Sequence, residues 1–201
     1  MNHVAQYLED AASIAAQIDQ EVVEQMIQKL IAVRENNGRL FILGVGGSAG
    51  NASHAVCDFR KLAEIEAYAP LDNISELTAR TNDEGWETVV AEWLKISKLC
   101  LKDLLMVFSV GGGDAERNIS ANLVSAIDLA KSVGAGVIGV AGRDGGYTGK
   151  MADAAVIVPT VNTDTVTAHA ESFQTLIWHL IISDPRIQRV GMKWESNHPL
   201  K

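Results

Sequence analysis

Cysteine is scarce in this chain. Cys57 and Cys100 are the only two among 201 residues. Two cysteines cannot form the disulfide framework that stabilises many small secreted domains. We therefore expect two reduced thiols, with Cys57 as a small core residue, in a cytoplasmic protein without a secretory signal.

Long hydrophobic runs and positive charge are lacking as well. No apolar stretch approaches the roughly 20 residues of a membrane helix, so we expect no membrane partner. The chain has 17 lysine and arginine residues against 25 aspartate and glutamate residues, a formal net charge of −8. This balance argues against nucleic acid as the main partner. The apolar share of 47% is typical of a globular protein, and the length suits one domain.

What the chain does contain is an alternation of short apolar runs and helical patterns. Apolar spacing of three and four predicts one or two helices in residues 2–36, with Asp19 capping the second. This helical face is broad, so part of it is expected to contact another subunit. Strands are predicted at 40–43, 68–71, 104–109, 136–140 and 155–158. The later helices are predicted at 48–64, 73–80, 86–99, 122–133, 147–152 and 167–183.

Strands that alternate with helices predict an α/β fold with a doubly wound, five-stranded parallel sheet and a long C-terminal helix. We expect a single domain over residues 1–201. It comprises a helical segment at 1–36 used in oligomer packing, an α/β core at 37–185 and a tail at 186–201. Because ligands of such sheets bind at the carboxyl ends of the strands, the turns that follow the strands are the candidate site.

The turn after the first predicted strand reads Gly44-Val45-Gly46-Gly47-Ser48. Glycines let a backbone approach a ligand closely, and the first turn of the next helix offers free N–H groups and a dipole that favours an anion. The turn lacks the lysine of a P-loop and matches the dinucleotide pattern only in part. It indicates either a phosphate seat at Gly46, Gly47 and Ser48 or a turn that serves packing alone.

His54 and Asp58 follow on the same predicted helix. Residues four apart lie on one face of a helix. A histidine and a carboxylate at this spacing can chelate one divalent ion or transfer protons. The alternative is an ordinary exposed pair, which is common at this spacing.

A second glycine-rich loop runs from Ser109 to Asn122, after a strand and before a helix. Ser120 is placed to cap that helix and to offer its hydroxyl to an anion. Arg117 can neutralise a phosphate. The alternative is a mobile loop with an ordinary cap.

Three other polar or aromatic residues near these motifs are less informative. Asp83 either contacts a ligand or caps the next predicted helix. His169 is expected to lie in a turn, with a role as a spare ligand or acid as the alternative, and Trp178 is expected to pack in the core.

Taken together, these motifs resemble the SIS (sugar isomerase) family, and within it the phosphoheptose isomerases. The likeness spans nearly the whole chain, through Gly44–Ser48, His54 with Asp58, residues 82–85, Ser109 with Ser120, residues 142–146 and His179. It implies a homotetramer that converts D-sedoheptulose 7-phosphate to D-glycero-D-manno-heptose 7-phosphate. This product is a precursor of lipopolysaccharide.

The resemblance also implies a role for each matched residue. Asp58 would be the base and His179 the acid of an aldose–ketose isomerisation, which needs both and a group that stabilises the developing oxyanion. A zinc ion would be held by His54, Asp58, Glu171 and His179. The sugar phosphate would be bound by Gly46, Gly47, Ser48, Asp83, Ser109, Gly111, Arg117 and Ser120.

The chain departs from the family pattern at several of these positions. Asp58 replaces a longer glutamate, Glu171 stands where a glutamine is usual, and Val45 replaces an asparagine. Glu171 and His179 are eight residues apart, about 12 Å along a helix, which is long for one metal ion. Two further hypotheses therefore stay open. One is an isomerase for another phosphorylated sugar, and the other is a non-catalytic protein that binds sugar phosphates or the replication initiator.

Overall fold

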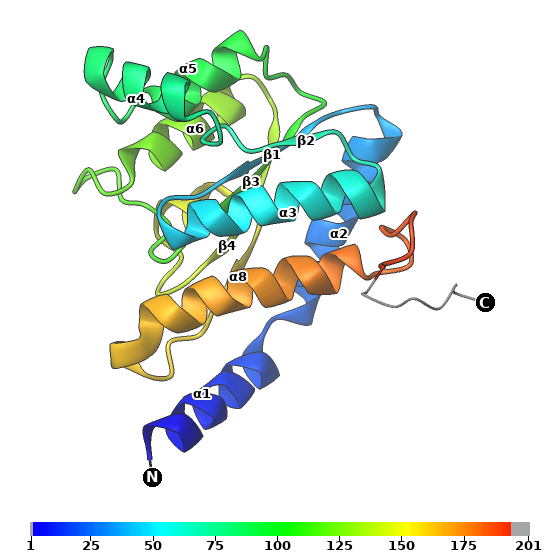
Figure 1. Cartoon of the computed structure of the whole chain (residues 1–201), viewed down its shortest axis with the longest axis vertical. Helices are drawn as coiled ribbons and strands as arrows, with labels where there is room; N and C mark the ends of the chain where they lie inside the picture. Colours follow the sequence, from blue (N-terminus) through cyan, green and yellow to red (C-terminus); the bar gives the residue numbers. More distant parts are fainter. Residues whose placement is uncertain (1, 194–201) are drawn as a thin grey trace.

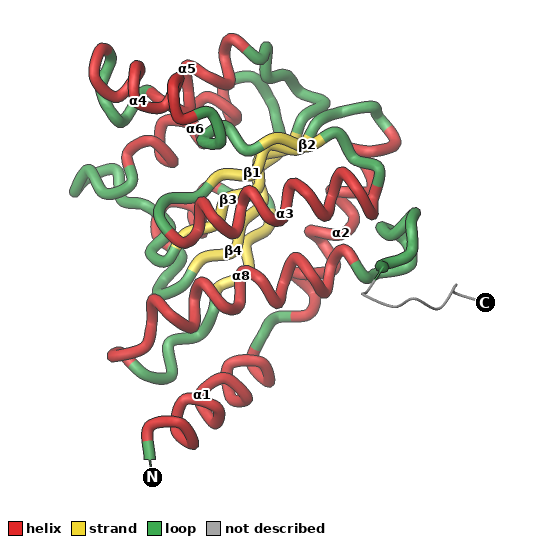
Figure 2. The backbone as a smooth tube through the Cα atoms, viewed as in Figure 1, coloured by secondary structure: helices red, strands yellow, loops and turns green. Residues whose placement is uncertain are grey.

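Five parallel strands form the central sheet in the computed structural model, which describes residues 2–193 (Figures 1 and 2). The strands are β1 Leu40–Leu43, β2 Ala67–Tyr68, β3 Leu104–Ser109, β4 Gly136–Ala141 and β5 Ala154–Ile157. Their order across the sheet is β2-β1-β3-β4-β5. The predicted doubly wound parallel sheet is confirmed. Because β1 and β3 are neighbours, their carboxyl-terminal turns lie side by side.

Helices cover both faces of this sheet. One face carries α2 Gln20–Glu35, α3 Gly47–Ala63 and α8 Val166–Ile182, and the other carries α5 Val89–Ile96, α6 Ala121–Ser132 and α7 Gly146–Met151. Alternate residues of a strand serve opposite cores: Ile42 packs toward α2, α3 and α8, and Phe41 toward α5 and α6. Every residue of β1 and β3 is buried, as expected for strands covered on both sides.

The N-terminal segment consists of two helices, α1 His3–Gln17 and α2. Asp19 caps α2, because its Oδ1 accepts the backbone N–H of Glu21 at 2.9 Å, as the sequence predicts. Figure 1 shows α1 extending away from the sheet. Two large apolar residues of α1, Val4 and Leu8, are exposed.

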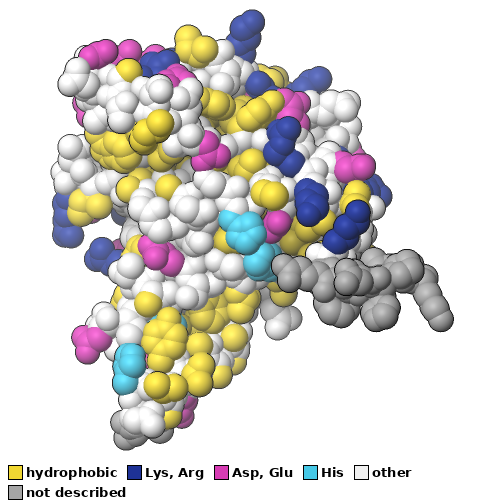
Figure 3. Space-filling view, in the orientation of Figure 1, with side chains coloured by type: hydrophobic (Ala, Val, Ile, Leu, Met, Phe, Trp, Pro, Cys, Tyr) yellow, Lys and Arg dark blue, Asp and Glu magenta, His cyan; other side chains and the backbone are white. Residues whose placement is uncertain are grey.

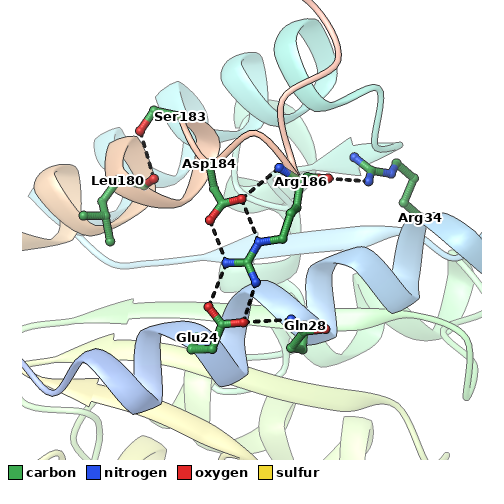
Figure 4. Close-up of polar contacts among 7 residues, drawn as sticks. All are labelled: Glu24, Gln28, Arg34, Leu180, Ser183, Asp184 and Arg186. Atoms are coloured by element: carbon green, nitrogen blue, oxygen red, sulfur yellow. Dashed lines mark hydrogen bonds and ion pairs between the residues drawn. The ribbon is translucent and has the colours of Figure 1, made fainter.

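An arginine joins α2 to the segment after α8 (Figure 4). The guanidinium of Arg186 donates to both carboxylate oxygens of Glu24, at 2.6 and 2.7 Å, and also to Asp184. Arg34 donates to the backbone oxygens of Arg186 and Ile187 at 2.8 and 2.7 Å. The hydrogen bonds from Arg186 lower the pKa of Glu24 to about 2. The predicted tail thus begins as a docked segment, and its part at 194–201 lies outside the described residues.

Two elements of the second quarter differ from the sequence prediction. The strand predicted at 68–71 is the two-residue edge strand β2, which pairs only with β1. Helix α4 Ile74–Asp83 ends three residues later than the helix predicted at 73–80, and Arg80 bridges Glu76 and Glu84 one turn on either side of it. Helix α5 starts later, after Thr88, so Asp83 does not cap it.

Two residues have surroundings other than those predicted. Cys57 is exposed on α3 and is not a core residue. His169 is buried within α8, downstream of the short 3-10 helix Thr163–Thr165, and its ring stacks on Tyr7 of α1. The side of α3 that carries Cys57 faces solvent, and the side of α8 that carries His169 faces α1. Within residues 2–193, no helix combines the length and apolarity of a membrane span.

Candidate functional site

Two glycines shape the turn between β1 and α3. Gly46 has a φ of +63°, in a region that L side chains rarely adopt. A Cβ atom on Gly47 would lie 2.5 Å from a carboxylate oxygen of Glu171 on α8. A carboxylate of the chain itself therefore lies against the predicted anion seat.

Polar side chains connect α3 to α8 next to this turn, along a contact that we call the α3–α8 seam. Ser48 is 1% exposed, and its Oγ accepts a hydrogen bond from Nε2 of Gln174 at 2.9 Å. Nδ2 of Asn51 donates to Oε1 of Gln174 at 2.8 Å and to the backbone oxygen of Glu171 at 2.9 Å. These bonds fix the position of α8 along α3. The sequence analysis does not identify Asn51 or Gln174 as site residues. The one feature that could have marked them is a polar side chain on an otherwise apolar face of a helix.

Farther along the same seam, two histidines and an aspartate converge. His54 and Asp58 come from α3 and His179 comes from α8. Nε2 of His54 lies 3.7 Å from Oδ2 of Asp58, and Nε2 of His179 lies 3.3 Å from the same oxygen. The side chain of Asp58 is 16% exposed, against 56% and 46% for the two histidines. Figure 3 shows histidine side chains at the surface over α3 and α8, so a small molecule can reach this triad.

Trp178 holds the carboxylate of the triad from the inner side. Its ring is fully buried and stacks on Phe108 of β3, with centroids 5.6 Å apart. Its Nε1–H donates to Oδ2 of Asp58 at 3.1 Å. The expected packing role of Trp178 is confirmed, and the hydrogen bond adds a positioning role that the sequence does not reveal.

The triad fits a divalent metal ion. One donor atom from each of His54, Asp58 and His179 lies within 4.8 Å of the other two. Donors about 2.0–2.2 Å from a tetrahedral zinc ion lie roughly 3.3–3.6 Å from one another, close to the two distances around Asp58. Two imidazoles and a carboxylate form a donor set that zinc accepts, with a fourth position left open, as in catalytic zinc sites. The buried indole N–H supplies the supporting hydrogen bond that such carboxylates usually have.

Glu171 is not part of this group. Its carboxylate lies against Gly47, two helical turns away from His179. Of the four ligands expected from the resemblance, the structure brings together His54, Asp58 and His179, and it has the carboxylate of Glu171 at the glycine turn. A metal contact of Glu171 stays a prediction.

The loop after β3 is partly as predicted. Ser109 is buried, and its Oγ accepts the backbone N–H of Gly112 at 2.9 Å. Arg117 is exposed, 3.7 Å from a carboxylate oxygen of Asp114. Ser120 is the residue before α6, but its φ is +51° and its side chain makes no capping hydrogen bond. Ser120 therefore occupies the predicted capping position, but the predicted side-chain hydrogen bond is not formed.

Asp83 has a hydrogen-bond partner within its own helix. It ends α4, and its Oδ1 accepts a hydrogen bond from Nδ2 of the neighbouring Asn82 at 2.7 Å. Within residues 2–193, no hydrogen bond or ion pair joins Asp83 to the triad. A contact of Asp83 with substrate stays a prediction.

The comparison with protein families decides which group this arrangement belongs to. A family model described as SIS domain matches residues 6–142, which is more than half of the chain. The chain belongs to the SIS domain family. The expectation drawn from its glycine turns and its helix-borne histidines is confirmed.

Related proteins show which branch of the family this SIS domain resembles. A phosphoheptose isomerase of Helicobacter pylori strain P12 is 34% identical over 153 residues, which cover 73% of this chain and 76% of that protein. The lincomycin biosynthesis protein LmbN of Streptomyces lincolnensis is 32% identical over 188 residues; these cover 89% of this chain and 66% of that protein.

Solved structures agree. Phosphoheptose isomerase GmhA from Neisseria gonorrhoeae matches with a TM-score of 0.78 and 28% identity, over 89% of this chain and 94% of that one. A phosphoheptose isomerase from Francisella tularensis has the same fold, with a TM-score of 0.76. The predicted enzyme class of this SIS domain, a phosphosugar isomerase, is confirmed by these likenesses.

Proposed function

We propose that this SIS domain is an aldose–ketose isomerase that converts D-sedoheptulose 7-phosphate to D-glycero-D-manno-heptose 7-phosphate. The observation that carries the proposal is the meeting of His54, Asp58 and His179 at the α3–α8 seam. The relatives named phosphoheptose isomerase support this choice of substrate. The product would serve lipopolysaccharide synthesis in the cytoplasm.

The reaction moves a proton between neighbouring carbons through an enediol. Oδ2 of Asp58 faces both imidazoles and the indole, and Oδ1 receives no hydrogen bond from the described residues, so Oδ1 is available to take the proton from carbon. His179, half exposed beside it, would donate the proton of its other ring nitrogen, Nδ1, to the neighbouring oxygen, because Nε2 faces Asp58 and the proposed metal. Trp178 keeps the carboxylate in place while the proton moves.

Zinc is the metal we propose for the triad. His54, Asp58 and His179 would hold it, and Glu171 would not. When bound, zinc supplies positive charge beside the oxygen on which negative charge develops. Glu171 instead faces the glycine turn, where it can accept a hydrogen bond from a sugar hydroxyl.

The sugar phosphate is proposed to contact the two turns at the strand ends. The residues are those expected from the resemblance, namely Gly46, Gly47, Ser48, Asp83, Ser109, Gly111, Arg117 and Ser120. Ser48 and Ser109 accept internal hydrogen bonds through Oγ, and each keeps its own O–H to donate to an anion. Gly47 and His54 are separated by about 10 Å along α3, a distance that suits an extended sugar rather than a short one.

The test is turnover of D-sedoheptulose 7-phosphate by the full chain with added zinc. The NMR signal of the aldose product monitors the reaction. Asp58→Asn and His179→Gln should each lower kcat at least about 100-fold. His3→Gln, an equivalent change on α1 far from the triad, should leave kcat unchanged. Absence of turnover by the wild type on this substrate and on related sugar phosphates would reject the proposal. A protein that also stays metal-free after zinc is offered would support the non-catalytic alternative.

A second candidate is an isomerase for a different phosphorylated sugar. The name of LmbN links a related chain to lincomycin biosynthesis, and that chain is 32% identical to this one. Glu171 at the glycine turn favours this candidate, since a carboxylate there would select the sugar by hydrogen bonding. A panel of phosphorylated ketoses of five to eight carbons, compared by kcat/KM, separates the two candidates.

A further inference from the structure

Two amide side chains link α3 to α8 beside the glycine turn. Gln174 on α8 is fully buried, and Asn51 on α3 is half-buried. An amide has a donor on one side and an acceptor on the other, so its orientation decides what it offers to each neighbour. In this pair, both orientations follow from the hydrogen-bond partners.

The backbone oxygen of Glu171 fixes the orientation of Asn51. A carbonyl oxygen only accepts hydrogen bonds, so the atom of Asn51 that lies 2.9 Å from it is the donor Nδ2. The same Nδ2 lies 2.8 Å from the amide of Gln174, which therefore presents its acceptor Oε1. On its other side, Oδ1 of Asn51 accepts a hydrogen bond from Oγ1 of Thr175 at 3.4 Å. A flipped Asn51 would lose these bonds.

Gln174 transmits this orientation to Ser48, the second residue of α3. With Oε1 turned toward Asn51, the amide directs its donor Nε2 at Oγ of Ser48, 2.9 Å away. Oγ accepts in this contact, so the hydroxyl hydrogen of Ser48 points elsewhere. Within residues 2–193, no hydrogen bond leads from that hydrogen to an acceptor, although Ser48 is only 1% exposed. An unpaired buried donor is unfavourable, so a ligand that accepts its hydrogen binds more tightly.

The triad lies one helical turn further along α8. Trp178 follows Gln174 by four residues, on the same face of the helix. Nε1 of Trp178 donates to Asp58 at 3.1 Å, just as Nε2 of Gln174 donates to Ser48. Helix α8 thus carries two donors one turn apart, one for the glycine turn and one for the triad. A change of Gln174 alone can therefore disturb the first contact while Trp178 maintains the second.

We propose that Gln174 is a positioning residue that holds the hydroxyl of Ser48 as a donor to the phosphate of the substrate. Asn51 acts through Gln174, because it fixes the orientation of the amide. The inference rests on the proposed function in one respect, the contact between Ser48 and phosphate, and it adds the residues that prepare Ser48 for that contact. A phosphate dianion only accepts hydrogen bonds, so a hydroxyl already fixed as a donor needs no reorientation when the ligand binds.

Calorimetric titration of the full chain with inorganic phosphate is the first experiment. Ser48→Ala removes the donor, and Gln174→Met keeps the length of the side chain but removes its amide; each should raise the dissociation constant about tenfold. The Ser48→Ala/Gln174→Met double variant should also lose about tenfold, not a hundredfold, because Gln174 acts only through Ser48. Gln25→Met, which changes an exposed glutamine on α2, should leave the dissociation constant unchanged.

Asn51→Ala tests the orientation without disturbing the buried position. It leaves the side chain of Gln174 in place but removes the partner that prevents the amide from flipping. We expect the dissociation constant for phosphate to rise about threefold, and we expect no such rise when Ser48 is already alanine. This variant decides the question if Gln174→Met does not fold, as judged by circular dichroism.

Two binding results would overturn the inference: a wild type that does not bind phosphate, and losses that simply multiply in the double variants. Steady-state kinetics adds an independent measurement. Gln174→Met should raise the KM of the sugar phosphate and leave kcat unchanged, since the triad is intact. A lowered kcat with unchanged KM would also contradict the inference. If phosphate binding follows the expected pattern but the wild type turns over no sugar, the proposed reaction fails and the positioning role of Gln174 stands.

Discussion

A single oxygen, Oδ2 of Asp58, is the meeting point of the candidate site at the residue scale. It lies 3.7 Å from Nε2 of His54, 3.3 Å from Nε2 of His179 and 3.1 Å from Nε1 of Trp178. The indole donates a hydrogen bond to this oxygen, and the two imidazole nitrogens stand where they can share a metal ion with it. The metal affinity of the protein should therefore depend on the charge of this oxygen more than on the length of the side chain.

Substitution of Asp58 tests this dependence. Asp58→Asn should weaken zinc binding by at least about tenfold, since a neutral amide is a poor zinc ligand, and Asp58→Glu should retain measurable binding. Competition with a chromophoric chelator measures both affinities. Asp164→Asn, which changes an exposed aspartate in the 3-10 helix Thr163–Thr165 before α8, is the matched control. Equal zinc affinity of the wild type and Asp58→Asn would show that the triad does not hold the metal.

The indole of Trp178 can be tested separately from its packing. Trp178→Phe keeps an aromatic ring in the fully buried position but removes the N–H donated to Asp58. Loss of such a supporting hydrogen bond should lower zinc affinity about tenfold. Trp178→Ala should in addition cost roughly 3–5 kcal/mol of folding stability through the lost core volume. If Trp178→Phe binds zinc as tightly as the wild type, the indole serves packing alone.

The three residues of the triad could be predicted from the sequence, but the residues that pack around them could not. His54 and Asp58 are one helical turn apart, so their common face follows from helix geometry. Glu171 and His179 are eight residues and two turns apart on one helix, and only the pairing of α8 with α3 shows that His179 meets the triad while Glu171 faces the glycine turn. Gln174 and Trp178 gain their roles from the same pairing.

At the element scale, the long buried strands were predictable and the edge of the sheet was not. Leu104–Ser109 is a continuous apolar run because both of its faces are covered, and the structure has β3 there. β2 pairs through two residues only, so no hydrophobic pattern marks it. The loop after β3 was recognised as a loop, but its internal hairpin rests on backbone hydrogen bonds between Asp114 and Ile119 that leave no composition signal.

The junction between α2 and the segment after α8 makes a prediction about pH. Arg186 holds the pKa of Glu24 at about 2, below its ordinary value of 4.5. A lowered carboxyl pKa contributes stability that is present above about pH 4.5 and lost as the pH falls through about 2. The stability difference between the wild type and Arg186→Gln should therefore be present at pH 6 and vanish near pH 2, as measured by urea unfolding.

The carboxyl titration of Glu24 checks the cause of that effect. Arg186→Gln should return the pKa of Glu24 toward 4.5, as followed by NMR. Arg80→Gln, which removes an arginine paired with carboxylates on α4, should leave the Glu24 titration unchanged. A Glu24 that titrates near 4.5 in the wild type would show that the bidentate contact in Figure 4 is not formed in solution.

At the scale of the whole molecule, one apolar surface is left uncovered by the rest of residues 2–193. Val4 and Leu8 on α1 are 66% and 64% exposed, and Leu176 and Leu180 on α8 are 43% and 49% exposed. Figure 3 shows hydrophobic side chains gathered along α1 and the adjoining side of α8. Between these helices and α2 lies a groove of about 510 Å³. Apolar patches of this kind mark contact surfaces, and we expect the homotetramer that the family resemblance implies to cover this one.

Leu8→Asp and Leu180→Asp place a charge in that surface and should shift the protein to smaller species in light scattering after size-exclusion chromatography. Both side chains are exposed in the chain, so the fold should be retained, and circular dichroism verifies it. Leu101→Asp is the matched control, because Leu101 is 73% exposed in the turn before β3, away from α1 and α8. A wild type that elutes as a monomer at all concentrations would contradict the tetramer. If the control dissociates as readily as the α1 and α8 variants, the subunits meet through another face.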